Sequence, residues 1–194
     1  MSFVERCRQR HVGSEGGDEG FTLIELLVVL LIIGILLAIA IPTFLSVTKG
    51  ANNTAAQSNL QNALTGAKTY FTDSNQTYTG LATPSATTSD IQQIGTGLSY
   101  ISGAASTGNK VISFKIVNAG AELVLAAWAP GSNECWGIID TTTSTGAVAE
   151  DGVAASVNVG TYYFVVKGAT ATQATCVAGT IASTGSSTTG FAGL

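Results

Sequence analysis

The stretch that decides the fold is "EGFTLIELLVVLLIIGILLAIAIPTF", which runs from Glu19 to Phe44. Its apolar run from Leu26 to Ile41 is uninterrupted and predicts a helix that enters or crosses a membrane. Glu25 stands just before that run, inside the segment. A carboxylate near the apolar core of a bilayer costs roughly 2.5–3.5 kcal/mol on insertion scales, and less near the interface. A simple anchor gains nothing from this cost, so we expect Glu25 to pair with a positive charge.

No basic side chain offers that charge, because neither Lys nor Arg occurs between Phe21 and Thr48. A cut between Gly20 and Phe21 would create a new positive charge. The freed amino group of Phe21 would lie about one helical turn from Glu25 of the same chain. It would also be able to reach Glu25 of a neighbouring chain.

The residues before the apolar run indicate the orientation of the segment. Arg6, Arg8 and Arg10 favour a cytoplasmic location for the N-terminus. A secretory signal peptide would have a shorter apolar core followed closely by a small-x-small cleavage site, and no such site follows here. The apolar run taken alone is equally typical of a signal anchor that tethers an outer domain.

The string "GFTLIELLVVLLIIGILLAIAIP" resembles the N-terminal signature of type IV prepilins and of the related type II secretion pseudopilins. The resemblance covers about Gly20 to Leu45. It implies that a prepilin peptidase removes residues 1–20 and then methylates the amino group of Phe21. It also implies that Glu25 neutralises the amino terminus of an adjacent subunit during assembly.

The leader is long for that family, and Asp18 and Glu19 occupy the place where a basic residue often precedes the glycine. The resemblance implies a homopolymeric helical filament as the mature form. It further implies three other partners: the prepilin peptidase and methyltransferase, a pilus assembly platform with its ATPase, and membrane lipid before assembly. The expected location is the cytoplasmic membrane for the single-pass precursor and the extracellular pilus afterwards.

Apolar residues continue beyond the run at spacings of mostly three and four, which predicts one helix over about residues 21–71. Its first half is apolar all round, and its second half is amphipathic. The apolar face comprises Phe44, Val47, Ala51, Ala55, Leu60, Ala63, Leu64, Ala67, Tyr70 and Phe71. Gly34 and Pro42 lie in the first half, where Pro42 removes a backbone donor. We expect a kink there, and a loss of helical structure between Gly34 and Pro42 in the packed filament.

Residues 72–194 are expected to form the head of an α+β protein. Thr72 to Asn109 is interpreted as a long loop with one short element near Ile91 to Tyr100. Four strands follow, and they predict a largely antiparallel sheet whose apolar face packs on the amphipathic half of the helix. The strands are "KVISFKIVN" (110–118), "AELVLAAWA" (121–129), "ECWGIID" (134–140) and "GTYYFVVKG" (160–168). The tail from Gly179 is expected to be mobile or loosely docked.

The chain has three cysteines: Cys7 before the apolar run, and Cys135 and Cys176 after it. If the run crosses a membrane, Cys135 and Cys176 can pair in an oxidising compartment while Cys7 stays reduced. The alternative is two free buried thiols. We expect the disulfide, which would constrain the unfolded chain by about 4 kcal/mol in the loop-entropy treatment. The enclosed segment resembles the C-terminal disulfide loop common in type IV pilins.

The sequence shows no catalytic, metal or cofactor site that we would assign. Its one histidine, His11, lies in the expected leader. Asp140, Glu150 and Asp151 are interpreted as solvated turn acids rather than as a calcium site. The formal net charge of −4 does not suggest a phosphate-binding protein, and we expect no direct binding of nucleic acid.

The leading hypothesis is therefore a structural subunit of a type IV pilus. The alternatives within the family are a type II secretion pseudopilin and a DNA-uptake pilin. Pseudopilins often carry a calcium site and no disulfide, so the pair Cys135 and Cys176 favours a pilin. Outside the family, the alternative is a monomeric membrane-anchored binding domain, which would need neither Glu25 nor cleavage after Gly20.

Overall fold

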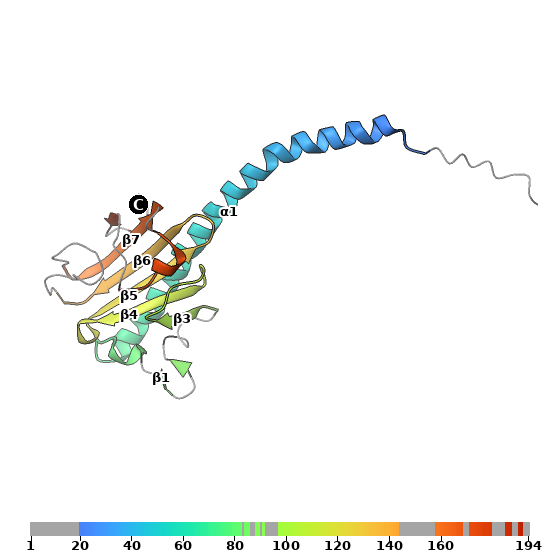
Figure 1. Ribbon diagram of the computed structural model, residues 1–194. Helices are drawn as coiled ribbons and strands as arrows, with labels where there is room; N and C mark the ends of the chain where they lie inside the picture. The colour runs from blue at the N-terminus through green and yellow to red at the C-terminus, as the bar shows by residue number, and fades with distance from the viewer. Residues whose placement is uncertain are drawn as a thin grey trace, which may run out of the picture. The chain divides into compact units, whose positions relative to one another are not determined.

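The computed structural model describes residues 20–82, 84–85, 88–89, 91, 97–143, 158–168, 171–179, 185–187 and 190–191 (Figure 1). The chain divides into two compact units, Met1–Thr43 and Phe44–Leu194. We call the second unit the head unit. Apart from Gly20, the expected leader lies outside the described residues, as does Cys7.

Helix α1 spans Leu23–Asp73, so the single long helix expected from the apolar spacing is confirmed. Gly34 and Pro42 both lie inside it, and the helix is continuous through them. Pro42 has no amide hydrogen to donate to the carbonyl of Ala38. The next residue adds a local bond, since the hydroxyl of Thr43 donates to the carbonyl of Ile39 at 2.5 Å. Loss of helix between Gly34 and Pro42 in a filament stays a prediction.

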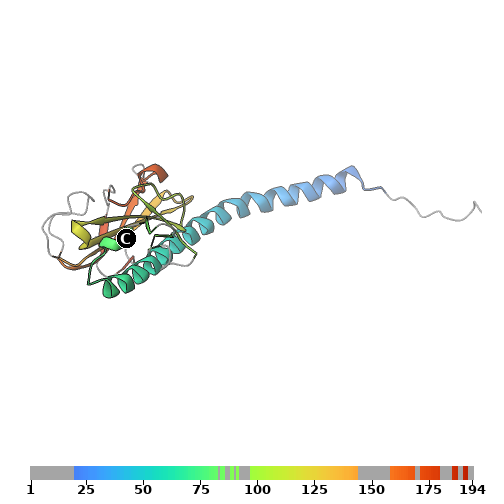
Figure 2. The same cartoon turned by 90° about the horizontal axis from the view of Figure 1, so that it is seen from below.

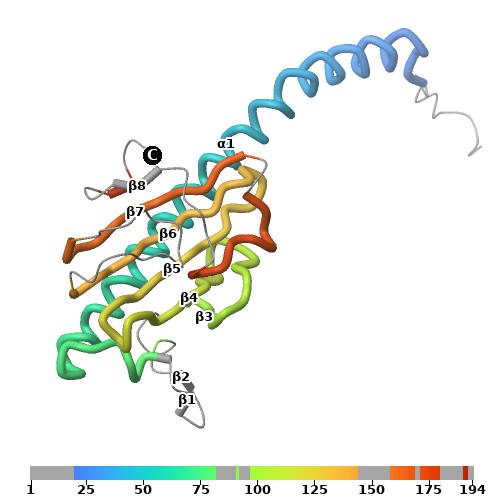
Figure 3. The backbone as a smooth tube through the Cα atoms, turned by 60° about the vertical axis from the view of Figure 1, so that its left-hand side comes forward, coloured from blue at the N-terminus to red at the C-terminus, as the bar shows by residue number. Residues whose placement is uncertain are grey.

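The head unit contains a six-stranded sheet in the order β3-β4-β5-β6-β7-β8 (Figure 3). Its strands are β3 (Ser99–Ser102), β4 (Val111–Val117), β5 (Glu122–Ala129), β6 (Glu134–Thr141), β7 (Gly160–Lys167) and β8 (Gly185–Ser187). The four expected strands are β4 to β7, and they pair antiparallel with their neighbours. The fold is therefore α+β, with a largely antiparallel sheet.

Two edge strands extend this sheet beyond the prediction. Strand β3 (Ser99–Ser102) pairs parallel with β4 and overlaps the end of the short element expected near Ile91 to Tyr100. Strand β8 pairs antiparallel with β7, so the described part of the C-terminal tail is docked rather than free. Phe191 is also buried, against the rings of Trp136 and Tyr163. A separate two-stranded ribbon joins β1 (Pro84–Ser85) to β2 (Thr88–Ser89).

The second half of α1 packs on one face of the sheet (Figure 2). The buried helix residues are Ala56, Leu60, Ala63, Leu64 and Ala67, and they contact a cluster that includes Ile112, Leu125, Ile138 and Val165. Three of the five are alanines, which let the helix backbone approach the sheet closely. The buried face begins later than expected, because Phe44 and Val47 are exposed.

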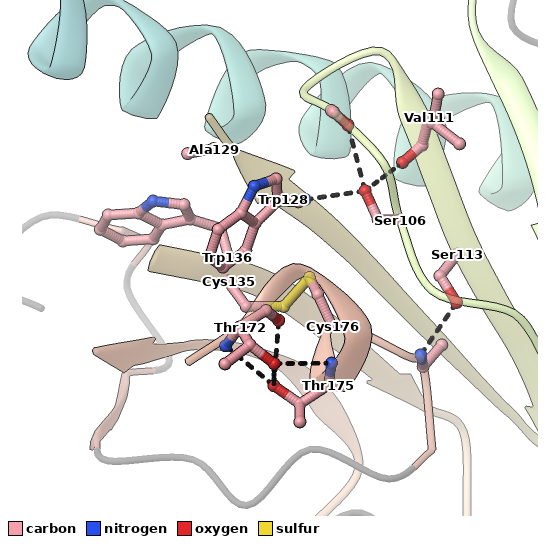
Figure 4. The surroundings of a disulfide bond; sticks show 12 residues. Ser106, Val111, Ser113, Trp128, Ala129, Cys135, Trp136, Thr172, Thr175 and Cys176 are labelled. Carbon is pink, nitrogen blue, oxygen red and sulfur yellow. Dashed lines mark hydrogen bonds between the residues drawn. A yellow bond between two sulfur atoms is a disulfide. The ribbon is translucent and has the colours of Figure 1, made fainter. Parts of the chain in front are cut away.

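The other face of the sheet is covered by the segment that contains Cys176 (Figure 4). Cys135 of β6 is bonded to Cys176, with Cα atoms 5.6 Å apart, which confirms the expected disulfide. The short helix η5 (Gln173–Thr175) precedes Cys176 and begins with a capping box between Thr172 and Thr175. Thus the sheet has α1 on one side and the disulfide-bonded segment on the other.

Asp140 corrects the interpretation of the acids as solvated turn residues. It is buried in β6, where its carboxylate accepts hydrogen bonds from Tyr78 at 2.7 Å and from Thr161 at 2.5 Å. Lys68 of α1 forms an ion pair with it at 2.9 Å. Burial, together with the bond to Asp140, raises the pKa of the Tyr78 hydroxyl far above its ordinary value. Glu150 and Asp151 lie outside the described residues.

Candidate functional site

The start of α1 is organised by a capping box between Thr22 and Glu25. The hydroxyl of Thr22 accepts a hydrogen bond from the backbone amide of Glu25 at 3.3 Å. In return, the Glu25 carboxylate accepts from the backbone amide of Thr22 at 2.9 Å and from its hydroxyl at 2.7 Å. This reciprocal pattern satisfies two amides that a helix N-terminus otherwise leaves without partners.

The capping box gives Glu25 a role within its own chain that the sequence reasoning did not identify. The signal was present, since Thr22-Leu-Ile-Glu25 has the spacing of a capping box before an apolar run. Both bonds to the carboxylate end on Oε2. Among the described residues, Oε1 of Glu25 has no hydrogen-bond donor, so the site can accept a further positive group.

Gly20 and Phe21 precede the helix as an exposed segment. The Phe21 side chain is 89% exposed. A Cβ added at Gly20 would meet nothing within 4 Å, so packing within the described chain does not require glycine there. A requirement for glycine at this position would have to come from an enzyme that binds the Gly20–Phe21 junction.

An apolar face surrounds the Glu25 carboxylate. Phe21, Glu25, Leu26, Val29 and Leu30 line a shallow recess along one side of the first turns of α1. All the large apolar side chains from Phe21 to Val47 are between 45% and 89% exposed. Water is an unfavourable solvent for so much apolar surface. Lipid tails, or the same helix of other copies, are environments that suit it.

Helix α1 is long and apolar enough near the N-terminus to cross a membrane. Elsewhere, within the residues that the structure describes, no group of three or more His, Cys, Asp or Glu side chains could hold a metal ion. The N-terminal site offers charge pairing by the Glu25 carboxylate beside an exposed apolar surface.

Comparison with known proteins identifies the same segment. Residues 17–41 match the prokaryotic N-terminal methylation motif. The chain is 42% identical over 59 residues to the type IV major pilin protein PilA of Myxococcus xanthus, which covers 30% of this chain and 27% of that protein. It is 46% identical over 57 residues to the type IV wide pilus major component PilA4 of Thermus thermophilus, covering 29% of this chain and 44% of that one.

The chain therefore carries the prokaryotic N-terminal methylation motif and is similar, over about 30% of its length, to two type IV major pilins. The matches span less than half the length of these two relatives. No solved structure matches the chain.

Proposed function

We propose that this protein is a structural subunit of a type IV pilus. The precursor is held in the cytoplasmic membrane by the first half of α1 and is cut after Gly20. Phe21 is then methylated on its new amino group, and the subunit polymerises into an extracellular filament. One observation carries the proposal: a carboxylate, Glu25, sits in the first turn of an exposed apolar helix, beside the expected cleavage junction.

Cleavage supplies the charge that Glu25 lacks in the precursor. The ammonium group of Phe21 lies one residue before the Thr22 cap, and methylation keeps its positive charge. When α1 of a second subunit packs alongside, both charges enter an apolar environment, in which an unpaired ion is strongly disfavoured. Pairing between the amino terminus of one subunit and Glu25 of its neighbour therefore favours one axial register over others.

The partners follow from this sequence of steps. A membrane peptidase and methyltransferase acts on Gly20 and Phe21, and an assembly platform with an ATPase extracts the subunit from lipid. The mature form is a homopolymer, as the names of the two major-pilin relatives support. We assign the protein no catalytic activity, because its similarity is to structural pilins.

Two observations favour a pilus subunit over the alternatives. Both relatives carry names of major pilins, and the head contains the Cys135–Cys176 disulfide. A monomeric membrane-anchored domain would not explain the prepilin motif. A DNA-uptake pilus would use the same subunit chemistry and differ in what the filament binds.

Mass spectrometry of the protein recovered from cells tests the proposal. A mature chain that begins at methylated Phe21 and is found in the sheared extracellular fraction is the expected result. An intact chain from Met1 to Leu194, found only in membranes, would support the monomeric anchor instead.

A further inference from the structure

Three exposed lysines lie at the end of the head unit where its own part of α1 begins. Lys49 is on α1, and a Cβ added at Gly131, in the turn between β5 and β6, would lie 3.8 Å from its Cγ. Lys110 directly precedes β4, and Lys167 is the last residue of β7. We call Lys49, Lys110 and Lys167 the lysine rim.

Strand register places the rim along one edge of the sheet. Ala129 of β5 faces Glu134 of β6, which in turn faces Lys167 of β7. In the antiparallel pairing of β4 with β5, Ile112 faces Ala127. Lys110 comes two residues before Ile112 and Ala129 two residues after Ala127, so Lys110 lies at the same level as Ala129. Alternation along the strands puts Lys110 and Lys167 on the face that α1 covers.

Amide side chains fix α1 to this same edge. Asn52 donates to the carbonyl of Pro130 at 2.8 Å, and Asn59 donates to the carbonyl of Asn109 at 2.8 Å. Asn109 also donates to the side-chain oxygen of Asn52 at 3.2 Å. These bonds hold Lys49 and Lys110 close to the point where the helix meets the sheet.

The rim has a net positive charge, because among the described residues its three lysines lie near a single carboxylate, that of Glu134, which faces Lys167 across the strands. Glu134 is partly buried and accepts a hydrogen bond from Asn53 at 2.6 Å. Asp73 and Asp140 lie at the other end of the head unit, where Asp140 pairs with Lys68. Among the described residues, no carboxylate lies within ion-pair distance of the rim lysines.

The rim follows directly on the apolar half of α1. Lys49 comes about 6 Å along the helix after Leu45, at ~1.5 Å per residue. When the apolar half spans a bilayer, this distance places Lys49 in the headgroup layer outside the hydrocarbon. The edge of the sheet that carries Lys110 is hydrogen-bonded to the next turns of the same helix.

We propose that the lysine rim binds the anionic headgroups of membrane phospholipids while the subunit is stored in the membrane. This inference rests on the proposed function, because it requires the membrane-held precursor. Each lysine near an anionic surface strengthens binding by about fivefold, and salt screens the attraction. The contact is broken when the subunit leaves the membrane for the filament.

Lysine acylation of the full-length protein in vesicles tests the proposal. One set of vesicles contains phosphatidylcholine alone, and the other also contains phosphatidylglycerol. A limiting amount of an amine-acylating reagent is added, and mass spectrometry gives the rate at each lysine. Lys68 and Lys115 are internal controls, since Lys68 pairs with Asp140 and Lys115 lies in the middle of β4 on the opposite sheet face.

We expect phosphatidylglycerol to slow acylation of the three rim lysines several-fold, and high salt to remove the effect. The two control lysines should react equally in both kinds of vesicle. Equal rates at the rim lysines in the two vesicles would overturn the proposal. So would protection that occurs only in assembled filaments, which would assign the rim to a contact between copies.

A matched pair of variants gives a second readout. Energy transfer from the tryptophans to a headgroup-labelled lipid should fall to its neutral-vesicle value in K49Q/K110Q/K167Q and should not change in K68Q/K115Q. Unchanged transfer in the triple variant would also contradict lipid binding. If wild-type protein shows no lipid-dependent protection but is still cleaved and assembled, this inference fails while the proposed function stands.

Discussion

The two halves of α1 differ in how their apolar side chains are covered. From Ala56 to Ala67, the helix buries a narrow face of small and branched apolar residues against its own sheet. From Phe21 to Val47, its large apolar side chains are exposed, from 45% to 89%. The second half is completed by the chain itself. The first half has no such cover among the described residues, which suits the subunit that we propose, because that subunit exchanges lipid for neighbouring copies.

The halves also differ in how they hold their charges. Asp140, packed near the second half, is surrounded within one chain by Lys68, Tyr78 and Thr161. Glu25 in the first half has only Thr22 as a hydrogen-bond partner among the described residues. A carboxylate with a complete set of partners stabilises a fold. One with an open acceptor beside an apolar surface can recruit another chain.

The largest expected effect comes from Gly20→Val, which should disturb the first half alone. We expect an uncleaved precursor in the membrane and no filaments, because the peptidase must reach a backbone without a side chain at the cut. The open space around Gly20 means that the head should fold normally. Immunoblotting of membrane and sheared fractions measures this, and a normal filament yield would defeat the processing step.

Removal of the disulfide should affect the head alone. The double change Cys135→Ala and Cys176→Ala is expected to lower the free energy of unfolding by about 2–5 kcal/mol. The free energy of unfolding is measured by denaturing the detergent-solubilised subunit while the circular dichroism of its tryptophans is recorded. Cleavage after Gly20 should be unaffected. Cys7→Ala, in the expected leader, is the control and should change nothing; unchanged stability in the double variant would be evidence against this role for the disulfide.

A pair of leucine changes compares the two halves directly. Leu60→Ala should cost about 2–5 kcal/mol of head stability, because Leu60 is fully buried between α1 and the sheet. Leu36→Ala should change head stability by less than about 0.5 kcal/mol, because Leu36 is 62% exposed. Leu36→Ala should instead lower the yield of filaments. Equal loss of stability in the two variants would show that the halves do not differ as described.

The smallest expected effect is that of Tyr78→Phe. This change removes one hydrogen bond to the buried Asp140 carboxylate and should cost about 1–3 kcal/mol. Tyr70→Phe is a suitable control, because Tyr70 is only partly buried and makes no bond to Asp140 among the described contacts. The same denaturation measurement applies. A cost no larger than that of the control would mean that Lys68 and Thr161 satisfy Asp140 without Tyr78.

Periodicity predicted much of this fold because the main elements have strong local patterns. The long helix and strand β4 repeat apolar residues at the spacing of their own element, and β5 to β7 are apolar runs of strand length between turn residues. Strands β3 and β8 have four and three residues, too few for a period to be recognised, and each depends on its neighbour for pairing. Asp140 was misinterpreted because Tyr78, one of its partners, is 62 positions away in the chain.

The candidate site was predicted in part. The motif around Gly20, Phe21 and Glu25 was recognised because it is contiguous in sequence. The capping bond between Thr22 and Glu25 was missed, although the two residues are only three positions apart. Glu25 was interpreted only as a carboxylate that pairs with a positive charge. Both roles now have to be separated by experiment.

The most direct test of the account compares Glu25→Gln with Thr22→Ala. Glutamine can still cap the helix, so Glu25→Gln removes the charge and keeps the local bond. Thr22→Ala removes the cap's hydroxyl and keeps the charge. The measurement is the ratio of sheared, pelletable filament to membrane-bound subunit. We expect both variants to insert and to be cleaved after Gly20. Thr22→Ala should assemble, and Glu25→Gln should not make normal filaments. Glu25→Gln filaments equal to wild type in amount and length would contradict the charge pairing.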